Sequence, residues 1–422
     1  MAPPASSIRP ALPWVLVGII VLALNLRAPI IAPTAVVPDI RADTGLGAAG
    51  VGMLTGLPVL LFALATPLAT RTIRRFGPET TVVLCLAGVL AGTVIRSLGP
   101  TPVIMAGTVL IGAAMTLGNI VVPVLIRRDV PWNRVGAATG AYSAVMNVGS
   151  MATLLGTPPL AAQFGWRWAI ASWGVVTAAA LAFWLVKARR LRLARGTTPM
   201  PPSPRPAPAD PVPSLPGGPG APHAAAGPAA DDAAGRRMKR ITALLLLGFC
   251  GQSGAYYATT AWLPTLLADT RGLAPAASGA SASLFQIAAI VGALGVPLVA
   301  ARTRAWIPVV LVGALWMALP IGLLVAPEAF VVWSLLGGVA QGGGFTAIFS
   351  IVPRIARSDA EAAAASARIQ AGGYLAATAA PPVAGWLNAA THGWTAPLLL
   401  VFALAVLFTA GSVAGARLSE RR

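Results

Sequence analysis

Residues 12–37 read LPWVLVGIIVLALNLRAPIIAPTAVV, a nearly unbroken apolar run with a single cation, Arg27, near its middle. The run is long enough to cross the roughly 30 Å of a bilayer core as a helix. It is also too long for the apolar core of a signal peptide, and no small-residue cleavage site follows it. We therefore predict a membrane-spanning helix that the mature protein keeps.

Further apolar runs of similar length follow, so the chain is predicted to cross the membrane repeatedly. The composition agrees, because 56% of the 422 residues are hydrophobic, 10% are charged and the mean hydropathy is +0.77. We expect an all-α membrane protein with twelve spans, at 12–37, 48–70, 80–99, 102–126, 136–162, 166–186, 241–267, 276–301, 306–326, 329–352, 362–387 and 394–416.

Arginine and lysine residues fall mainly in alternate loops, which explains the formal charge of +18. The loops on one side of the predicted spans hold nearly all of them, including the cluster from Lys187 to Arg195. The opposite loops hold little beyond Arg41, Arg167 and Arg271. The positive-inside rule therefore places both termini in the cytoplasm, and the charge needs no nucleic-acid partner.

The cysteines, histidines and lysines exclude several classes of chemistry. Cys85 and Cys250 lie in different spans with no ligand-spaced Cys or His, and we interpret both as small buried residues. His223 lies between the halves and His392 in an outer loop, so neither a metal site nor another cofactor is expected. Neither lysine follows a glycine, as the lysine of a Walker loop must. We expect no ATPase motor and no enzymatic activity.

The chain divides into two similar halves. Residues 191–238 are dominated by Pro, Ala, Gly and Ser, and we predict a disordered cytoplasmic linker between six-helix bundles at 1–190 and 239–422. Asp43 and Gly165-Trp166 are echoed by Asp269 and Gly393-Trp394, at an offset of about 226 residues or slightly more. Because both halves start on the same side, the pattern indicates a parallel duplication.

Five motifs narrow the interpretation. They are Asn25-Leu26-Arg27-Ala28-Pro29, Gly56-Leu57-Pro58-Val59-Leu60, Gly118-Asn119 before Val121-Val122-Pro123, Trp262-Leu263-Pro264 and Gln341-Gly342-Gly343. Together with the duplicated layout they resemble the major facilitator superfamily, and within it the branch that transports cyanate and 2-nitroimidazole. The resemblance covers nearly all of the chain outside the linker. It implies that spans one, four, seven and ten line a central cavity.

One position departs from the superfamily pattern. Thr70 stands where the family usually has an aspartate ahead of the arginines in the loop between spans two and three. In the family that acid helps to latch the two halves together on the cytoplasmic side, so a different latch is implied here. Arg71, Arg74 and Arg75 remain candidates for gating.

Arg27 is the leading candidate for binding, because an unpaired guanidinium at bilayer depth costs at least ~2.5 kcal/mol on insertion scales. We expect it to hold an anion; the alternative is a structural arginine that donates to buried carbonyls. Asn25 lies two residues away and should instead bond a neighbouring helix. The other candidates for the substrate site are Gln252 and Tyr256 in span seven, Gln341 in span ten, and Gln370 and Tyr374 in span eleven.

Several polar and aromatic residues carry a second interpretation. For Gln252 and Gln341 it is an interhelical hydrogen bond. Arg368 lies about two turns from the cytoplasmic end of its span, where its side chain can reach water. Asn119 and Asn147 we interpret as mostly structural, and the remaining residues as either walls of the site or ordinary packing: Tyr142, Tyr257 and Trp262.

The predicted spans contain no Asp or Glu, so the carboxylate relay of many proton-coupled carriers is missing. Coupling, with protons as the candidate ion, would use the charge of the substrate or acids at loop edges such as Asp39, Asp129 and Asp269. We expect a monomeric secondary transporter of a cyanate-like anion in the bacterial cytoplasmic membrane. The alternatives are an exporter of small nitroaromatic heterocycles and a transporter-like receptor that binds a ligand without flux.

Overall fold

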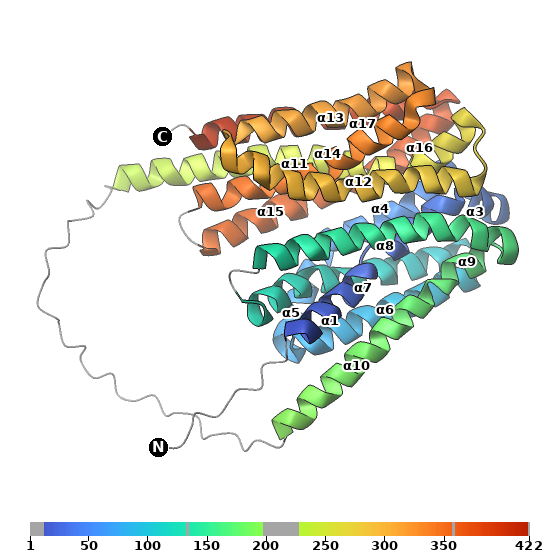
Figure 1. Ribbon diagram of the computed structural model, residues 1–422, viewed down its shortest axis with the longest axis horizontal. Coiled ribbons are helices and arrows are strands. Elements are labelled where there is room, and N and C mark those ends of the chain that lie inside the picture. Colours follow the sequence, from blue (N-terminus) through green and yellow to red (C-terminus); the bar gives the residue numbers. More distant parts are fainter. Residues whose placement is uncertain (1–11, 132–134, 197–227, 357–358, 421–422) are drawn as a thin grey trace, which may run out of the picture.

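A computed structural model describes residues 12–131, 135–196, 228–356 and 359–420. Within these ranges every regular element is a helix. The helices of the N-terminal half, α1 to α10, form one group, and those of the C-terminal half, α11 to α17, form a second group beside it (Figure 1). We call the end where α10 finishes and α11 begins the linker end, and the opposite end, near α3, the far end (Figure 1).

The first predicted span is a broken helix. It consists of α1 (Leu12–Leu24), α2 (Ala28–Ile31), the 3-10 helix η1 (Ala32–Val36) and α3 (Val37–Thr44). Pro29 and Pro33 have no backbone N–H, so they cannot donate to the carbonyls of Asn25 and Pro29, each four residues earlier. Residues 25–27 form a turn instead of continuing the helix.

The remaining helices are long and mostly continuous. In the N-terminal half they are α4 (Ala48–Leu64), α5 (Thr66–Phe76), α6 (Pro78–Leu98), α7 (Thr101–Asp129), α8 (Val135–Phe164), α9 (Trp166–Ser172) and α10 (Gly174–Gly196). In the C-terminal half they are α11 (Pro228–Arg271), α12 (Pro275–Arg302), α13 (Trp306–Val325), η3 (Pro327–Ala329), α14 (Phe330–Ile355), α15 (Asp359–Ala377), α16 (Ala380–Thr391) and α17 (Thr395–Glu420).

The chain is a multi-pass membrane protein. In the described ranges nine helical stretches are long and apolar enough to cross a bilayer, or ten if α4 and α5, bent by 59°, count as one span. The predicted spans 136–162 and 362–387 coincide with α8 and with α15 and α16, which are helical but rich in Gly, Ala, Ser and Thr. Twelve crossings and cytoplasmic termini remain predictions.

Helices extend further into the predicted linker than its composition indicates. Helix α10 continues to Gly196 and α11 begins at Pro228, so both ends of the 191–238 range are helical rather than disordered. Lys187 and Lys239 lie where these helices continue beyond their apolar runs. The centre of the linker, with His223, lies outside the described residues.

Close packing between the halves is concentrated at the far end. There α4 packs against α16, and α8 packs against α12. A Cβ on Gly52 would lie 2.7 Å from the carbonyl oxygen of Pro381, and one on Gly56 would lie 2.6 Å from that of Thr378. Only glycine allows backbones to approach so closely, and such contacts are typical of helix pairs in membranes.

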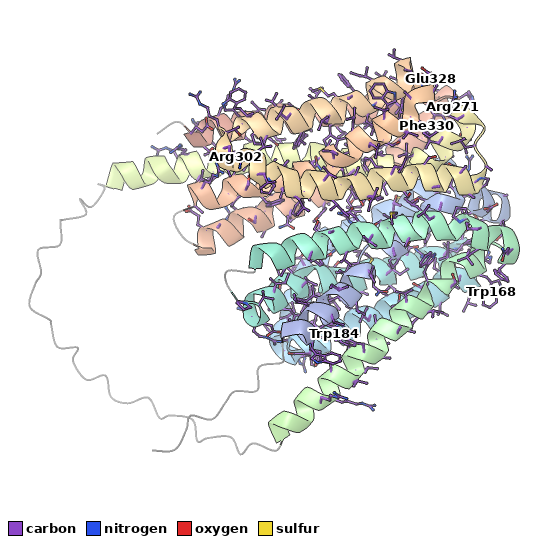
Figure 2. The ribbon with its side chains drawn as sticks, viewed as in Figure 1. Trp168, Trp184, Arg271, Arg302, Glu328 and Phe330 are labelled. Carbon is purple, nitrogen blue, oxygen red and sulfur yellow. The ribbon has the colours of Figure 1, made fainter. Side chains whose placement is uncertain are left out.

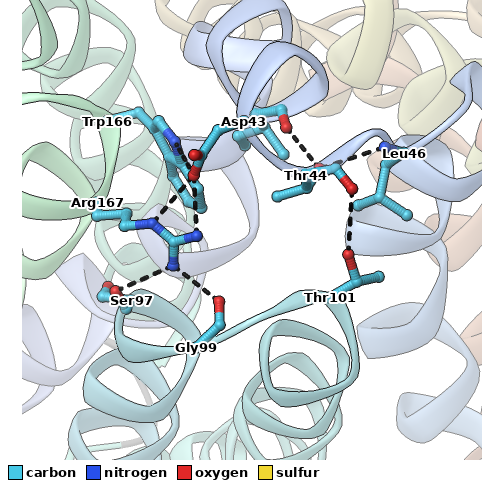
Figure 3. A network of polar contacts seen from close by, with 9 residues as sticks. Asp43, Thr44, Leu46, Ser97, Gly99, Thr101, Trp166 and Arg167 are labelled. Atoms are coloured by element: carbon cyan, nitrogen blue, oxygen red, sulfur yellow. Dashed lines mark hydrogen bonds and ion pairs between the residues drawn. The ribbon is translucent and has the colours of Figure 1, made fainter.

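A polar corner fixes the far end of the N-terminal half (Figure 3). The Arg167 guanidinium donates to the Asp43 carboxylate, with Nη2 2.8 Å from Oδ2, and to the Gly99 carbonyl, 2.8 Å away. Trp166 Nε1 donates to the same carboxylate at 3.2 Å. These contacts join α3, α9 and the loop after α6.

Charged residues of the C-terminal half mark the two ends of the molecule (Figure 2). Arg271 and Glu328 lie near the far end, and Arg302 lies toward the linker end. Helix α12, which begins just after Arg271 and ends at Arg302, therefore runs from one end to the other. This placement is the one expected if the loops of one end are basic and those of the other are nearly neutral.

Candidate functional site

The break in the first span places Arg27 between the two halves. Arg27 is the residue that precedes α2, and its carbonyl accepts the N–H groups of Ile30 and Ile31 at 3.0 and 3.2 Å. Its backbone therefore belongs to the start of a short new helix and not to the end of α1. Interrupted helices at bilayer depth are typical of transporter sites, since polar backbone there is tolerated only around a cavity or within protein.

Two residues hold the Arg27 side chain. Its Nη1 donates to Oδ1 of Asn147 in α8 at 2.8 Å. Asn147 in turn donates from Nδ2 to the Ser143 carbonyl at 2.9 Å, which leaves its oxygen directed at Arg27. The guanidinium lies over the ring of Tyr256 in α11, 4.8 Å from the ring centroid, in a cation–π contact. Arg27 therefore touches both halves of the molecule.

A cavity of about 50 Å³ surrounds this arginine. Arg27 is the one charged residue among those that line it, so the cavity is electropositive and favours an anion. The lining comes from both halves and consists of Leu26, Arg27, Ile30, Ile31, Thr55, Phe62, Asn119, Met146, Tyr256, Tyr257, Thr260 and Tyr374.

Aromatic rings form one wall of the cavity. Tyr256 and Tyr257 meet edge to face with centroids 4.8 Å apart, and Phe62 of α4 meets Tyr374 of α15 across the two halves at 5.7 Å. Phe249 extends the wall beyond Tyr374, 5.4 Å away. Rings in this arrangement present flat apolar surfaces beside a cation, which suits a small planar solute.

Three of the predicted substrate residues lie together here: Arg27, Tyr256 and Tyr374. Gln252 is elsewhere, because both ends of its amide are used between helices. Its Nε2 donates to the Gln341 carbonyl at 2.8 Å, and its Oε1 accepts from Trp316 Nε1 at 2.7 Å. The structure therefore supports the alternative interpretation of Gln252, an interhelical hydrogen bond.

Gln341 and Gln370 do not line the cavity either. Gln341 is 6% exposed, and its Oε1 has no partner within the described residues. Gln370 is half-buried, one turn before Tyr374 on α15, and lies outside the cavity lining. Sharing a helix face with Tyr374 did not bring Gln370 into the lining.

The prediction for Asn25 is confirmed. Its Oδ1 accepts a 2.7 Å hydrogen bond from Thr177 of α10, a neighbouring helix, and its Nδ2 donates to the Val21 carbonyl. Asn147 and Asn119 were interpreted as mostly structural, yet Asn147 binds Arg27 and Asn119 lines the cavity. The signal in the sequence was the amide side chain of each residue, since an amide at mid-span depth is costly unless it meets a polar partner.

The gating candidates lie at the linker end. Arg71, Arg74 and Arg75 are exposed on α5, and the Arg75 guanidinium lies 5.3 Å from the centroid of Phe76. Arg368 is exposed on α15 and takes no part in the cavity lining. Thr70, in the position of the usual aspartate, donates to the Thr66 carbonyl of its own helix.

An ion-pair cluster joins the start of α6 to the end of α7 at the same end. Arg128 donates to Glu79 at 2.7 Å and to Asp129 at 2.6 Å. The hydrogen bond to Asp129, followed by that to Glu79, raises the pKa of the Arg128 guanidinium above its ordinary value. Among the residues that the structure describes, no group of three His, Cys, Asp or Glu side chains is arranged for a metal ion.

Comparisons with known proteins give one consistent result. Residues 15–327 match the family model of the Major Facilitator Superfamily. An uncharacterised transporter of Bacillus subtilis strain 168 is 30% identical over 95% of this chain and 93% of its own length. A 2-nitroimidazole transporter of Escherichia coli strain K12 is 30% identical over 96% of both chains.

Solved structures show the same fold at low sequence identity. A bacterial homologue of the human lysosomal transporter Spinster, inward-facing and unoccupied, has a TM-score of 0.66 at 17% identity and covers 97% of this chain and 95% of its own. A variant of the nucleoside transporter NupG has a TM-score of 0.69 at 11% identity, with 95% of this chain and 99% of that chain covered.

Proposed function

Because the chain belongs to the Major Facilitator Superfamily, we propose that it is a secondary active transporter that moves a small anionic or polar solute past Arg27 by alternating access. The protein is a membrane transporter and not an enzyme. In the proposal two six-helix bundles cross the membrane twelve times, with both termini in the cytoplasm of a bacterial cell. The two bundles rock about the site.

One observation carries the proposal. A single guanidinium, held by Asn147 and Tyr256, lies in a cavity between the halves whose lining contains no carboxylate. Such a group attracts an anion or a strongly polarised solute, and a site at the interface of the halves is the one exposed to each side in turn. Cyanate-like anions are the first candidates, because the cavity is small.

The direction of closure follows from the packing. Gly52 and Gly56 bring α4 against α16 at the far end, which in the proposed topology is the outer side of the membrane. The halves are therefore sealed toward the outside in this conformation. Opening that side requires these backbones to separate, so the same contacts would have to form and break in every transport cycle.

A second candidate substrate has its own support. The aromatic wall of Tyr256, Tyr257 and Tyr374 offers stacking surfaces for a heterocycle, and Arg27 would donate to a nitro group. The Escherichia coli relative is named for 2-nitroimidazole transport. In this alternative the chain would be an exporter of small nitroaromatic heterocycles.

Flux in proteoliposomes tests the proposal. Protein reconstituted into vesicles should move radiolabelled cyanate or 2-nitroimidazole faster than empty vesicles do, and Arg27→Ala should abolish that movement. Arg368→Ala is the matched control, because Arg368 is exposed and lies outside the cavity lining. Binding without flux would instead identify a receptor. An imposed pH gradient that leaves the rate unchanged would exclude proton coupling.

A further inference from the structure

A second buried arginine lies behind the broken segment. Arg96, near the end of α6, is 2% exposed. Its Nη1 donates to the carbonyl of Pro29 at 2.6 Å. That carbonyl has no partner within its own helix, because the residue four positions later is Pro33, which has no N–H. Arg96 therefore completes a hydrogen bond that the broken span cannot make for itself.

The other edge of this guanidinium is unused. Nε and Nη2 of Arg96 are buried and have no hydrogen-bond partner within the described part of the chain. The ion pairs found in that part involve Arg128 and Arg167, and not Arg96. In a guanidinium, Nε–H and the adjacent Nη–H point in parallel and receive the two oxygens of a carboxylate. A buried charge without such a partner is costly.

A cavity of about 140 Å³ adjoins Arg96. An apolar cavity of ~150 Å³ in a small engineered protein accommodates benzene, which indicates the size of ligand that fits. Most of the lining is apolar. The lining residues other than Arg96 are Leu24, Asn25, Ala28, Pro29, Ala32, Thr93, Gly149, Ala152, Thr153, Ile170, Trp173, Val176 and Thr177.

We propose that this cavity is a second binding site, specific for a monocarboxylate. Nε and Nη2 of Arg96, which are closed off from the cavity in this conformation, turn toward it to receive the carboxylate, and the apolar side chains around Ala152 and Ile170 receive the tail. The acid comes either from solution, as a short-chain or aromatic acid, or from the bilayer, as a fatty acid. The site stands on its own residues and does not depend on the substrate proposed for Arg27.

The two sites lie on opposite sides of one segment. Ala28 and Pro29 line the second cavity, whereas Arg27 and Ile30 line the first. A carboxylate on Arg96 therefore sits beside the backbone that carries Arg27. A carboxylate that binds more tightly to one position of this segment than to another changes the affinity of Arg27 for its ligand. By the same linkage, a ligand on Arg27 changes the affinity of Arg96 for the carboxylate.

Benzoate is a suitable probe, because it joins a carboxylate to a benzene-sized ring. Equilibrium dialysis with radiolabelled benzoate on detergent-purified protein should show one site per chain in the wild type, because the cavity of about 50 Å³ at Arg27 is too small for this ring. Ala152→Leu fills the second cavity and should remove that site. Ala162→Leu, an exposed position on the same helix, is the matched control and should keep it. Benzoate binding that Ala152→Leu leaves intact would overturn the proposal.

Variants of the arginines locate the remaining binding. Arg27→Gln should keep the benzoate site that Ala152→Leu removes, and loss of all binding in folded Arg27→Gln protein would contradict the proposal. Arg96→Lys keeps a donor for the Pro29 carbonyl but not the parallel pair, so affinity at this site should fall about tenfold. An unchanged affinity would show that the pair is not used. Benzyl alcohol, the neutral analogue, should fail to compete.

Competition identifies the source of the acid. If the ligand comes from the bilayer, oleate should displace benzoate at a concentration at least about tenfold below that of butyrate, because only its carboxylate end has to fit the cavity of about 140 Å³ while the rest of the chain stays in apolar surroundings. If it comes from solution, butyrate and acetate should compete and oleate should not. Failure of all three acids to displace benzoate from the Arg96 site would exclude a carboxylate site.

Discussion

The first and seventh spans are repeats of one another, yet one is broken and the other is continuous. At the offset of 226 that relates Asp43 to Asp269, Pro29 and Pro33 correspond to Ala255 and Thr259. Helix α11 accordingly runs unbroken from Pro228 to Arg271, whereas the first span divides into four short elements. Two prolines, four residues apart, account for the difference, since they remove two helical hydrogen bonds about one turn apart.

The comparison shows how a duplicated fold acquires one asymmetric site. The broken span supplies the cation, Arg27, where its repeat has Ser253. The continuous span supplies the aromatic partner, Tyr256, and uses Gln252 to bind α14 and Trp316 of α13. The N-terminal half therefore provides charge on an interrupted backbone, and the C-terminal half provides a rigid aromatic wall.

Removing the cation should have the largest effect on this asymmetry. A charged hydrogen bond in a partly desolvated cavity contributes roughly 1.5 to 3 kcal/mol, so Arg27→Ala should weaken binding roughly ten- to a hundredfold and abolish uptake. Arg27→Lys should retain weak binding of a simple anion and almost none of a ligand held by two parallel donors. Binding should be measured on purified protein, normalised to the monodisperse fraction. Normal binding by a poorly folding Arg27→Ala protein would make Arg27 structural.

Repairing the break should make the first span resemble the seventh. The double variant Pro29→Ala with Pro33→Thr restores the two missing N–H donors, so the segment can continue as one helix. We expect a higher thermal midpoint together with a loss of most transport, because Arg27 would leave its position over Tyr256. A stabilised variant that transports at the normal rate would show that the break is not needed.

A carboxylate beside Arg27 should neutralise the site without changing its shape. Asn147→Asp replaces the amide that accepts from Arg27 with an anion, so binding of an anionic substrate should fall by at least about tenfold. Asn147→Ala is the comparison variant and removes one hydrogen bond, for roughly a three- to tenfold loss. If both variants lose the same amount, the charge of Arg27 does not bind the substrate.

The seal at the far end should affect rate more than affinity. Gly56→Leu places a side chain against the Thr378 carbonyl, so α4 and α16 cannot pack as closely in the outward-closed state. Uptake should slow severalfold while equilibrium binding survives. The prolines inside α4 and α12, Pro58 and Pro297, are the next positions to vary. An unchanged rate in Gly56→Leu would show that this contact is incidental to gating.

The smallest effect is expected where the two halves are joined. A segment with the composition of residues 200–230 buries no core, so it only has to reach from one half to the other. Replacing it with about a dozen Gly and Ser residues should leave uptake within about twofold of normal. Loss of uptake with normal membrane expression would assign the linker a further role.

Much of this architecture could be predicted from the sequence. Apolar runs fixed the positions of most helices, and the echo of Asp43 by Asp269 revealed the duplication. The importance of Arg27 and the interhelical hydrogen bond of Asn25 could also be predicted, because a charge or an amide within an apolar run has few possible polar partners. These predictions depend on how deep in the membrane a residue lies, and its position within the apolar run gives that depth directly.

The rest depends on rotation about the helix axis and on neighbours distant in sequence. Gln252 and Tyr256 lie on the same face of α11, yet Gln252 meets Trp316 and Tyr256 meets Arg27. Asn147 became part of the site because α8 crosses the break in the first span. Arg96 was overlooked because it lies near a helix end, where an arginine usually reaches water, and only the structure shows it buried.

The corner formed by Asp43 and Arg167 has a consequence for biosynthesis. All of its partners, including Trp166 and the Gly99 carbonyl, lie within the first six predicted spans. In the second half the corresponding aspartate, Asp269, binds Trp394, and Thr395 stands where Arg167 would be. A ribosome releases the N-terminal half first, and domains generally fold as units in that order. The early half can thus lock its far end before the translocon has received any of the later one.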